Sequence, residues 1–270
     1  MRPRIMGIVN VTPDSFSDGG AFATAAAAIA HGLQLAEEGA DFVDVGGEST
    51  RPGAAPVTSA EELRRVLPVV SALAREGVHV SIDTMKPDVA RAAVECGASI
   101  WNDVSALRAD GAVEAAAALG CDVILMHMQG EPRTMQAAPH YDDAVADVAD
   151  FLSTRIAALQ AAGVKHGIWV DPGIGFGKTL EHNLALLRAV PALRARIGRP
   201  VVVGASRKSF ISKLETRDGA AASPESERLG GSLAVALHAA AADADMLRVH
   251  DVAATVQALR VARALNERAS

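Results

Sequence analysis

Short runs of apolar, mostly β-branched residues recur along the whole chain and predict eight buried strands. They lie at residues 5–9, 42–45, 78–82, 99–101, 123–126, 168–170, 201–203 and 246–249. Between these runs the apolar positions follow helical spacing. One face of a helix over about residues 142–162 is predicted by Val145, Val148, Leu152, Ile156 and Leu159. Strands and helices are therefore expected to alternate.

This alternation favours a closed parallel (β/α)8 barrel, a TIM barrel, over an open doubly wound sheet. Eight strand–helix units fit within 270 residues, and the strands are apolar on both faces, as in a parallel barrel covered by helices. No linker divides the chain, so we predict one domain over residues 1–270. The segment from Ser59 to Glu62 has the pattern of a capping box at a helix start.

Composition narrows the class of protein. Half of the residues are hydrophobic and 21% are charged, which is typical of a packed globular chain. The net charge of −6 argues against a general nucleic-acid binder, and no apolar run is long enough to cross a membrane. Cys96 and Cys121 have no metal-ligand spacing and are predicted to be buried free thiols. Without a signal peptide, we expect a cytoplasmic protein.

Polar residues follow the predicted strands and form a candidate ligand site. In a (β/α)8 barrel the carboxyl ends of the strands meet at one face, where active sites lie. For single residues the alternatives stay open, because an Asp or Asn can be a turn residue and His127 can be a packing residue. The set consists of Asn10, Glu48, Asp83, Asn102, His127, Asp171, Lys208 and His250.

Two of these strand ends suggest that the ligand carries phosphate. Strand 7 leads into SRKS at residues 206–209, and strand 8 ends in Arg248 and His250, the two places where barrels usually bind phosphate. The alternative is a group of solvated surface charges. The glycine-rich turn at 173–179 lacks the Walker spacing, so it is interpreted as a turn that lets Phe176 pack on a flat ligand.

Six segments of the sequence resemble, in the same order, the signature stretches of the dihydropteroate synthase family. They are NVTPDSFSDGG at 10–20, DVGGESTRPG at 44–53, SIDT at 81–84, NDVS at 102–105, DPGIGFGKT at 171–179 and SRKSF at 206–210. The family condenses 6-hydroxymethyl-7,8-dihydropterin pyrophosphate with para-aminobenzoate in folate biosynthesis. Its members use Mg²⁺ on a (β/α)8 barrel and are usually homodimers. The resemblance thus implies a transferase that is a sulfonamide target.

The resemblance also implies roles for individual residues. The pterin would contact Asp83, Asn102, Met126, Asp171, Phe176 and Lys208. Pyrophosphate would contact Asn10, Thr50, Arg248 and His250, with Asn10 also on magnesium. The para-aminobenzoate pocket would comprise Phe16, Thr50, Arg51, Pro52 and Ser209, partly on two loops that close over the site. The residues expected to act in catalysis are Asp83, Asp18 and Lys208.

A neutral arylamine is already nucleophilic, so the reaction needs a good leaving group more than a strong base. We expect magnesium, Arg248 and His250 to stabilise the departing pyrophosphate, while Asp83, helped by Asp18, stabilises positive charge on the pterin methylene.

Three alternatives remain at this point. A pterin-binding methyltransferase would share the carboxylate and amide set but lack the aminobenzoate loop. A barrel aldolase would use Lys208 as a Schiff-base lysine. An inactive homologue would bind pterin without turnover. The chain also departs from the family pattern at Ala106, where glycine is usual, and relatives usually carry a segment before the first strand, so the natural start is expected upstream of Met1.

Overall fold

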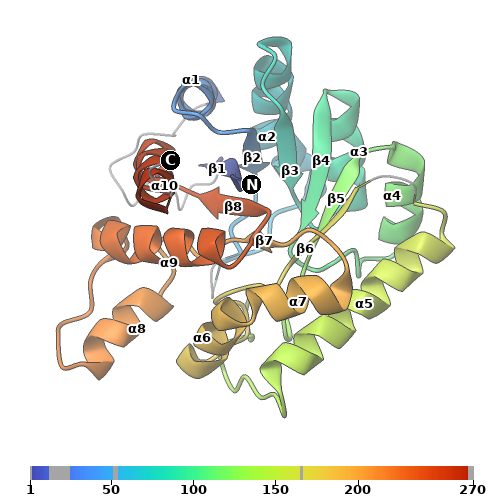
Figure 1. Cartoon of the computed structure of the whole chain (residues 1–270). Helices are drawn as coiled ribbons and strands as arrows, with labels where there is room; N and C mark the ends of the chain where they lie inside the picture. The colour runs from blue at the N-terminus through green and yellow to red at the C-terminus, as the bar shows by residue number, and fades with distance from the viewer. Residues whose placement is uncertain (1, 12–24, 51–53, 165–166, 267–270) are drawn as a thin grey trace.

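Eight parallel strands form one barrel in the computed structural model, which describes residues 2–11, 25–50, 54–164 and 167–266. The strands are β1 (Arg4–Asn10), β2 (Phe42–Gly46), β3 (Val80–Asp83), β4 (Ala98–Asp103), β5 (Asp122–Met126), β6 (Ile168–Asp171), β7 (Val202–Val203) and β8 (Met246–Val249). They are hydrogen-bonded in the order β6-β5-β4-β3-β2-β1-β8-β7 (Figure 1). A parallel bridge between Val170 and Val201 joins β6 to the chain entering β7 and completes the ring. The predicted (β/α)8 barrel is confirmed.

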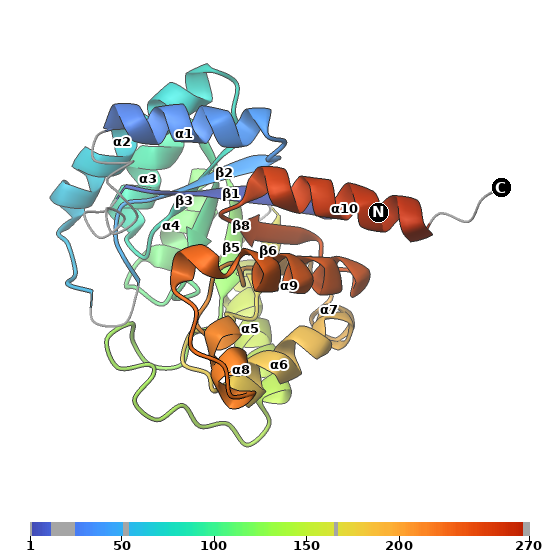
Figure 2. The same cartoon turned by 90° about the vertical axis from the view of Figure 1, so that its left-hand side faces the viewer.

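Helices surround the barrel on its outer face. They are α1 (Ala25–Glu37), α2 (Ser59–Arg75), α3 (Pro87–Glu95), α4 (Ala112–Leu119), α5 (Ala144–Ala161), α6 (Leu180–Arg188), α7 (Val190–Ile197), α8 (Phe210–Arg217), α9 (Leu229–Ala241) and α10 (Val252–Asn266). The strict alternation holds up to β6, after which two helices precede β7 and two precede β8. Figure 2 shows α9 and α10 lying side by side next to β8.

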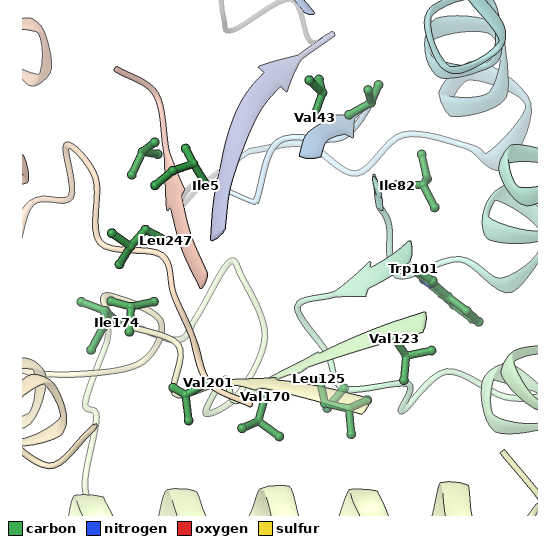
Figure 3. Packing of buried hydrophobic residues seen from close by; sticks show 14 of the residues in the cluster. Ile5, Val43, Ile82, Trp101, Val123, Leu125, Val170, Ile174, Val201 and Leu247 are labelled. Carbon is green, nitrogen blue, oxygen red and sulfur yellow. The ribbon is translucent and has the colours of Figure 1, made fainter. Parts of the chain in front are cut away.

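Alternate strand residues face opposite sides of the barrel wall. One set, including Ile5, Val43 and Trp101, packs against the helices in a single buried cluster (Figure 3). The other set faces the barrel interior, where Met6 and Ile100 belong to a separate apolar cluster. Because side chains alternate with a period of two, the interior set continues upward into polar residues at the carboxyl ends of the strands.

Local signals set the helix boundaries. The predicted helix over 142–162 is α5, whose N-cap Asp143 accepts hydrogen bonds from the backbone N–H groups of Val145 and Ala146. The capping box predicted to begin at Ser59 is wrong by one residue. Thr58 is the N-cap of α2, and its hydroxyl accepts the backbone N–H of Glu61 at 3.2 Å. Ser and Thr are both favoured at the N-cap, and Thr58 is the residue with the extended backbone of a cap, at φ −70° and ψ 155°.

Two further sequence predictions concern features outside the barrel wall. Cys96 and Cys121 are free thiols, as predicted, but the predicted burial is confirmed only for Cys121, because Cys96 is partly exposed. Among the described residues, every helix is too short or too polar to serve as a membrane span.

Candidate active site

A cavity of about 560 Å³ opens at the carboxyl ends of the strands. Its lining draws residues from the ends of strands β1, β3 and β8 and from the loops after β2, β5, β6, β7 and β8, which are far apart in the sequence. Nine residues singled out from the sequence line it: Asn10, Glu48, Thr50, Asp83, Phe176, Lys208, Ser209, Arg248 and His250. The barrel therefore brings these nine residues together at one cavity.

Three other predicted residues end neighbouring strands but are absent from the cavity lining. Asn102, Met126 and Asp171 are each about 5% exposed or less. Asn102 pairs with Asp83 in the sheet register, and Met126 pairs with Asp171. Their side chains thus form a buried layer next to the cavity rather than its open wall.

Asp171 holds the turn that follows its own strand. Its Oδ1 accepts the backbone N–H of Gly173 at 2.6 Å, as expected for an Asp in a turn. Burial raises the pKa of Asp171, and the nearby Lys208 ammonium opposes that rise. The turn interpretation of Asp171 therefore holds in this structure, while its carboxylate also supplies negative charge beneath Lys208.

Arg248 connects two strands across the mouth of the barrel. Its Nε donates to Asp44 Oδ2 and its Nη2 donates to Asp83 Oδ2, both at 2.6 Å. Asn102 Nδ2 donates to the same Asp44 oxygen at 3.0 Å. Burial alone would lower the pKa of Arg248, but the two carboxylates raise it overall. Burial raises the pKa of Asp83, and Arg248 acts against this rise.

Asp44 is a site residue that the sequence interpretation missed. Its side chain is fully buried, and its Oδ1 has no hydrogen-bond partner among the described residues. A usable signal was present, because Asp44 lies two residues before Gly46 at the end of β2 and so faces the same side of the strand. A charged residue inside an otherwise apolar strand is rarely buried without a partner.

Lys208 lines the cavity from the loop after β7. Its Nζ donates to the Ile174 carbonyl oxygen and lies 4.4 Å from the centroid of the Phe176 ring. Burial lowers the pKa of Lys208 to about 8, while Asp171 acts in the opposite direction. An ammonium over an aromatic face next to buried carboxylates can bind a flat heterocycle with polar edges.

The predicted phosphate-binding corner joins the loops after β7 and β8. Ser206 Oγ accepts the backbone N–H of His250 at 3.2 Å and lies 3.1 Å from its Nδ1. Arg207 is bound to Asp251 at 2.6 Å, and the two side chains are 24% and 20% exposed, so Arg207 is a paired and partly buried cation rather than a solvated surface charge. Ser209 occupies the N-cap position of α8 and lines the cavity. Serine hydroxyl, imidazole and a helix N-terminus together can bind an anion.

His127 is a packing residue, one of its two open interpretations. Its ring is 6% exposed and packs edge-on against Phe151 at 4.9 Å. Its Nδ1 lies 3.0 Å from the Nζ of Lys178, a buried lysine that the sequence interpretation treated only as part of a turn.

Glu48, the predicted polar residue after β2, belongs to a buried group of charges. Lys86 Nζ lies 2.5 Å from carboxylate oxygens of both Glu48 and Glu62. The other Glu48 oxygen accepts the backbone N–H of Val57 at 3.1 Å. Glu48 thus ties together the two ends of the loop that carries Thr50, which lines the cavity.

Four predicted site residues, Phe16, Asp18, Arg51 and Pro52, lie outside the described residues. Within the described part of the chain, no group of three or more His, Cys, Asp or Glu side chains could hold a metal ion. The donor at the predicted metal position is the amide of Asn10, which lines the cavity. A hard amide oxygen suits Mg²⁺ when most of the remaining ligands are phosphate oxygens and water.

The fold and the site together define a class of protein: a (β/α)8 barrel enzyme whose cavity suits a flat polar heterocycle beside an anionic group. Residues 6–250 match the model of the family described as pterin binding enzyme. The chain belongs to this family and, within it, to the dihydropteroate synthases.

Individual relatives support this placement. The chain is 50% identical over 264 residues to the dihydropteroate synthase of Escherichia coli strain K12, covering 97% of this chain and 91% of that protein. The structure of the Yersinia pestis enzyme with a sulfonamide drug complex matches with a TM-score of 0.92 at 45% identity, covering 98% of this chain and 94% of that one. The Xanthomonas albilineans enzyme with 4-aminobenzoic acid matches with a TM-score of 0.90 at 52% identity, covering 99% and 94%.

Proposed function

We propose that the protein condenses 6-hydroxymethyl-7,8-dihydropterin pyrophosphate with para-aminobenzoate, giving 7,8-dihydropteroate and pyrophosphate in folate biosynthesis. The observation that carries this proposal is the convergence of Asp83, Lys208 and Arg248 on one cavity from the end of β3, the loop after β7 and the end of β8. They supply a carboxylate, an ammonium and a guanidinium, which suits a substrate with a polar heterocycle at one end and a pyrophosphate at the other.

The pterin end is assigned to the side of the cavity where carboxylates and an aromatic ring meet. Asp83 and Asp171 would accept hydrogen bonds from the amino and ring N–H groups, and Asn102 and Lys208 would donate to the carbonyl side. The ring of Phe176 lines the cavity, and Met126 packs in the same apolar cluster as Phe176. Asn102, Met126 and Asp171 are buried here, so the pterin must enter deeper than the open cavity to touch them.

The pyrophosphate end is assigned to Arg248, His250, Asn10 and Thr50, all of which line the cavity. In this structure Arg248 donates hydrogen bonds to two carboxylates. With pyrophosphate bound, part of the guanidinium would reorient to donate to the phosphate oxygens. Magnesium, when bound, would neutralise charge on the leaving group, with the Asn10 amide oxygen as the protein group to hold it.

The aminobenzoate is assigned to the outer part of the cavity. Its carboxylate would meet the Ser209 hydroxyl and the first backbone N–H groups of α8, where the helix dipole favours negative charge. Thr50 lines the same cavity from the loop after β2. Phe16, Arg51 and Pro52 are proposed to complete this pocket, and Asp18 to assist Asp83.

The reaction follows from these placements. The carbon–oxygen bond between the pterin methylene and pyrophosphate breaks, and the electron pair leaves on pyrophosphate beside Arg248 and His250. The methylene gains positive charge, which the Asp83 carboxylate stabilises. The amine nitrogen then forms the new carbon–nitrogen bond and releases one proton to water. Lys208 acts by holding the pterin against the Phe176 ring.

A Schiff-base role for Lys208 is the competing function that one observation favours. Burial lowers the pKa of Lys208 to about 8, which increases the fraction of free amine. However, its Nζ is engaged with the Ile174 carbonyl oxygen and the Phe176 ring. Dihydropterin pyrophosphate has no aldehyde or ketone, so the test uses a carbonyl substrate of the aldol type with borohydride, and the protein mass should stay unchanged.

The decisive experiment measures pyrophosphate release from dihydropterin pyrophosphate and Mg²⁺, with and without para-aminobenzoate, and identifies the pterin product by mass. Amine-dependent release with dihydropteroate as product is the expected result. Pterin binding without amine-dependent release would favour the methyltransferase or the inactive homologue instead. Adding a sulfonamide should inhibit the reaction in competition with para-aminobenzoate.

A cytoplasmic homodimer is proposed as the working form of the enzyme. The free thiols Cys96 and Cys121 suit a reducing compartment. The dimer is proposed from the family, with the alanine-rich stretch at 239–242 as a candidate packing surface, and light scattering on the purified protein tests it.

A further inference from the structure

A buried lysine next to the cavity takes no part in the proposed chemistry. Lys178, in the loop between β6 and α6, is 1% exposed and does not line the cavity. Its Nζ lies 3.0 Å from His127 Nδ1 and donates to the carbonyl oxygens of His127 at 3.3 Å and Phe176 at 2.9 Å. An ammonium has three donors, and three acceptors surround it.

These acceptors belong to two different loops, and Lys178 lies 51 positions after His127 in the sequence. His127 follows β5, and Phe176 lies in the loop after β6. The two loops pack with no spare room, since a Cβ added to Gly173 would lie 1.9 Å from the His127 carbonyl oxygen. Lys178 therefore joins the loops from beneath, where water cannot replace its hydrogen bonds.

Phe176 is the residue through which this link reaches the cavity. Its carbonyl oxygen is fixed by Lys178, while its ring lines the cavity and lies 4.4 Å from Lys208 Nζ. The next residue back is fixed as well, because the Gly175 carbonyl oxygen accepts Gln136 Nε2 at 2.5 Å. Hydrogen bonds from Lys178 and Gln136 thus hold the backbone at Phe176 and Gly175, while the side chains of Phe176 and Lys208 line the cavity.

We propose that Lys178 is a positioning residue that fixes the Phe176 ring in the wall of the pterin subsite. This inference rests on the proposed function, because it assigns the Phe176 side of the cavity to the pterin. Without the Lys178 hydrogen bonds, three buried acceptors lose their donor and the loop moves to find other partners. The Phe176 ring and the Lys208 ammonium would then move away from the positions in which they contact a bound heterocycle.

The main test is the Lys178→Met variant, which keeps the length of the side chain and removes the donors. We expect the dissociation constant of dihydropterin pyrophosphate, measured by pterin fluorescence, to rise about 10-fold or more. The KM for dihydropterin pyrophosphate should rise in parallel, whereas the KM for para-aminobenzoate should change by less than about 3-fold, because its proposed pocket does not include Phe176.

A matched control separates positioning from general stability. Arg155 also fixes a strand-to-helix loop by donating to two carbonyl oxygens, those of Ala106 at 2.8 Å and Leu107 at 2.6 Å. It does not line the cavity. Arg155→Met should lower the melting temperature, as Lys178→Met does, while pterin affinity stays at the wild-type value.

A second variant keeps the inference testable if Lys178→Met does not fold. His127→Phe preserves the ring packed against Phe151 and removes one of the three acceptors, and a roughly 3-fold loss of pterin affinity is expected. Wild-type pterin affinity in every folded variant of Lys178 and His127 would overturn the inference alone. A wild-type protein that binds pterin but forms no dihydropteroate would overturn the proposed function while leaving the inference open to the same binding test. A wild-type protein that binds no pterin would overturn both.

Discussion

Removing the ammonium of Lys86 should destabilise the protein strongly, because two carboxylates depend on it. Its Nζ lies 2.5 Å from oxygens of Glu48 and Glu62. The Glu62 side chain is fully buried and that of Glu48 is 10% exposed. Burial lowers the pKa of Lys86, but the hydrogen bonds of the two carboxylates more than offset this and the pKa is raised. Lys86→Met would leave both carboxylates without a cation.

The size of the effect follows from burial. Removing one partner of a buried ion pair costs about 3–5 kcal/mol, because the remaining charge stays desolvated. Lys86 is 23% exposed, so water can reach part of the group and relieve some of this cost. We therefore expect a loss of about 2–4 kcal/mol in the free energy of unfolding at neutral pH.

A double-mutant cycle with Glu62→Gln tests the cause. The Glu62→Gln change removes one of the two unpaired buried charges. The double variant should therefore be more stable than Lys86→Met by at least about 1 kcal/mol in the free energy of unfolding. Urea denaturation midpoints of the four proteins supply the measurement. The control is Arg64→Met, which removes a cation from the exposed pair with Glu61 and should leave the midpoint unchanged. If Lys86→Met matches this control, or if the double variant is no more stable than the single one, the electrostatic reasoning is wrong.

Three further predictions address the site. Gly173→Ala should lower the free energy of unfolding, measured by urea denaturation, by at least about 2 kcal/mol more than Gly111→Ala does. Both glycines have φ near +70°, but an added Cβ meets nothing within 4 Å at Gly111 and a backbone oxygen at 1.9 Å at Gly173; equal losses would contradict the steric argument. Burial lowers the pKa of His127 to about 3, so proton uptake favours the unfolded chain below its ordinary value of 6.5. Stability should therefore fall from pH 6.5 toward pH 3, by at most about 1.4 kcal/mol per pH unit for this group. In His127→Phe the slope of stability against pH should be smaller over this range, and an unchanged slope would refute the assignment. Arg248→Lys loses the planar fork of donors that reaches Asp44 and Asp83 from two separate nitrogens. It should reduce kcat/KM for dihydropterin pyrophosphate about 10–100-fold, whereas Arg194→Lys on the exposed surface should change nothing.

The function of His127 shows where sequence reasoning stops. Its position at the end of β5 follows from the apolar run before it, so its place at the site face was predictable. Whether its ring points to a ligand or into the packing depends on Lys178, which is 51 residues away along the chain. Neither the composition nor the spacing of residues in the chain indicates that contact.

Asp44 and Asp83 illustrate the same division. Both end or nearly end a strand, and period-two alternation places both on the interior face. The single guanidinium that binds both comes from Arg248 on β8, and only closure of the barrel brings that strand beside β1. The ion pairs that set the charge of the cavity are therefore properties of the tertiary structure.

The eight strands, most helices and the polar residues at the strand ends were predictable from the sequence, because these depend on side-chain alternation and neighbouring residues. Which hydrogen-bond and ion-pair partners those polar groups have depends on the tertiary structure. It buried Asn102 and Asp171 beside the cavity, paired Glu48 with Lys86, and placed Lys178 beneath Phe176. Such pairings depend on distances between loops far apart in the sequence, and the close packing of the folded barrel sets those distances.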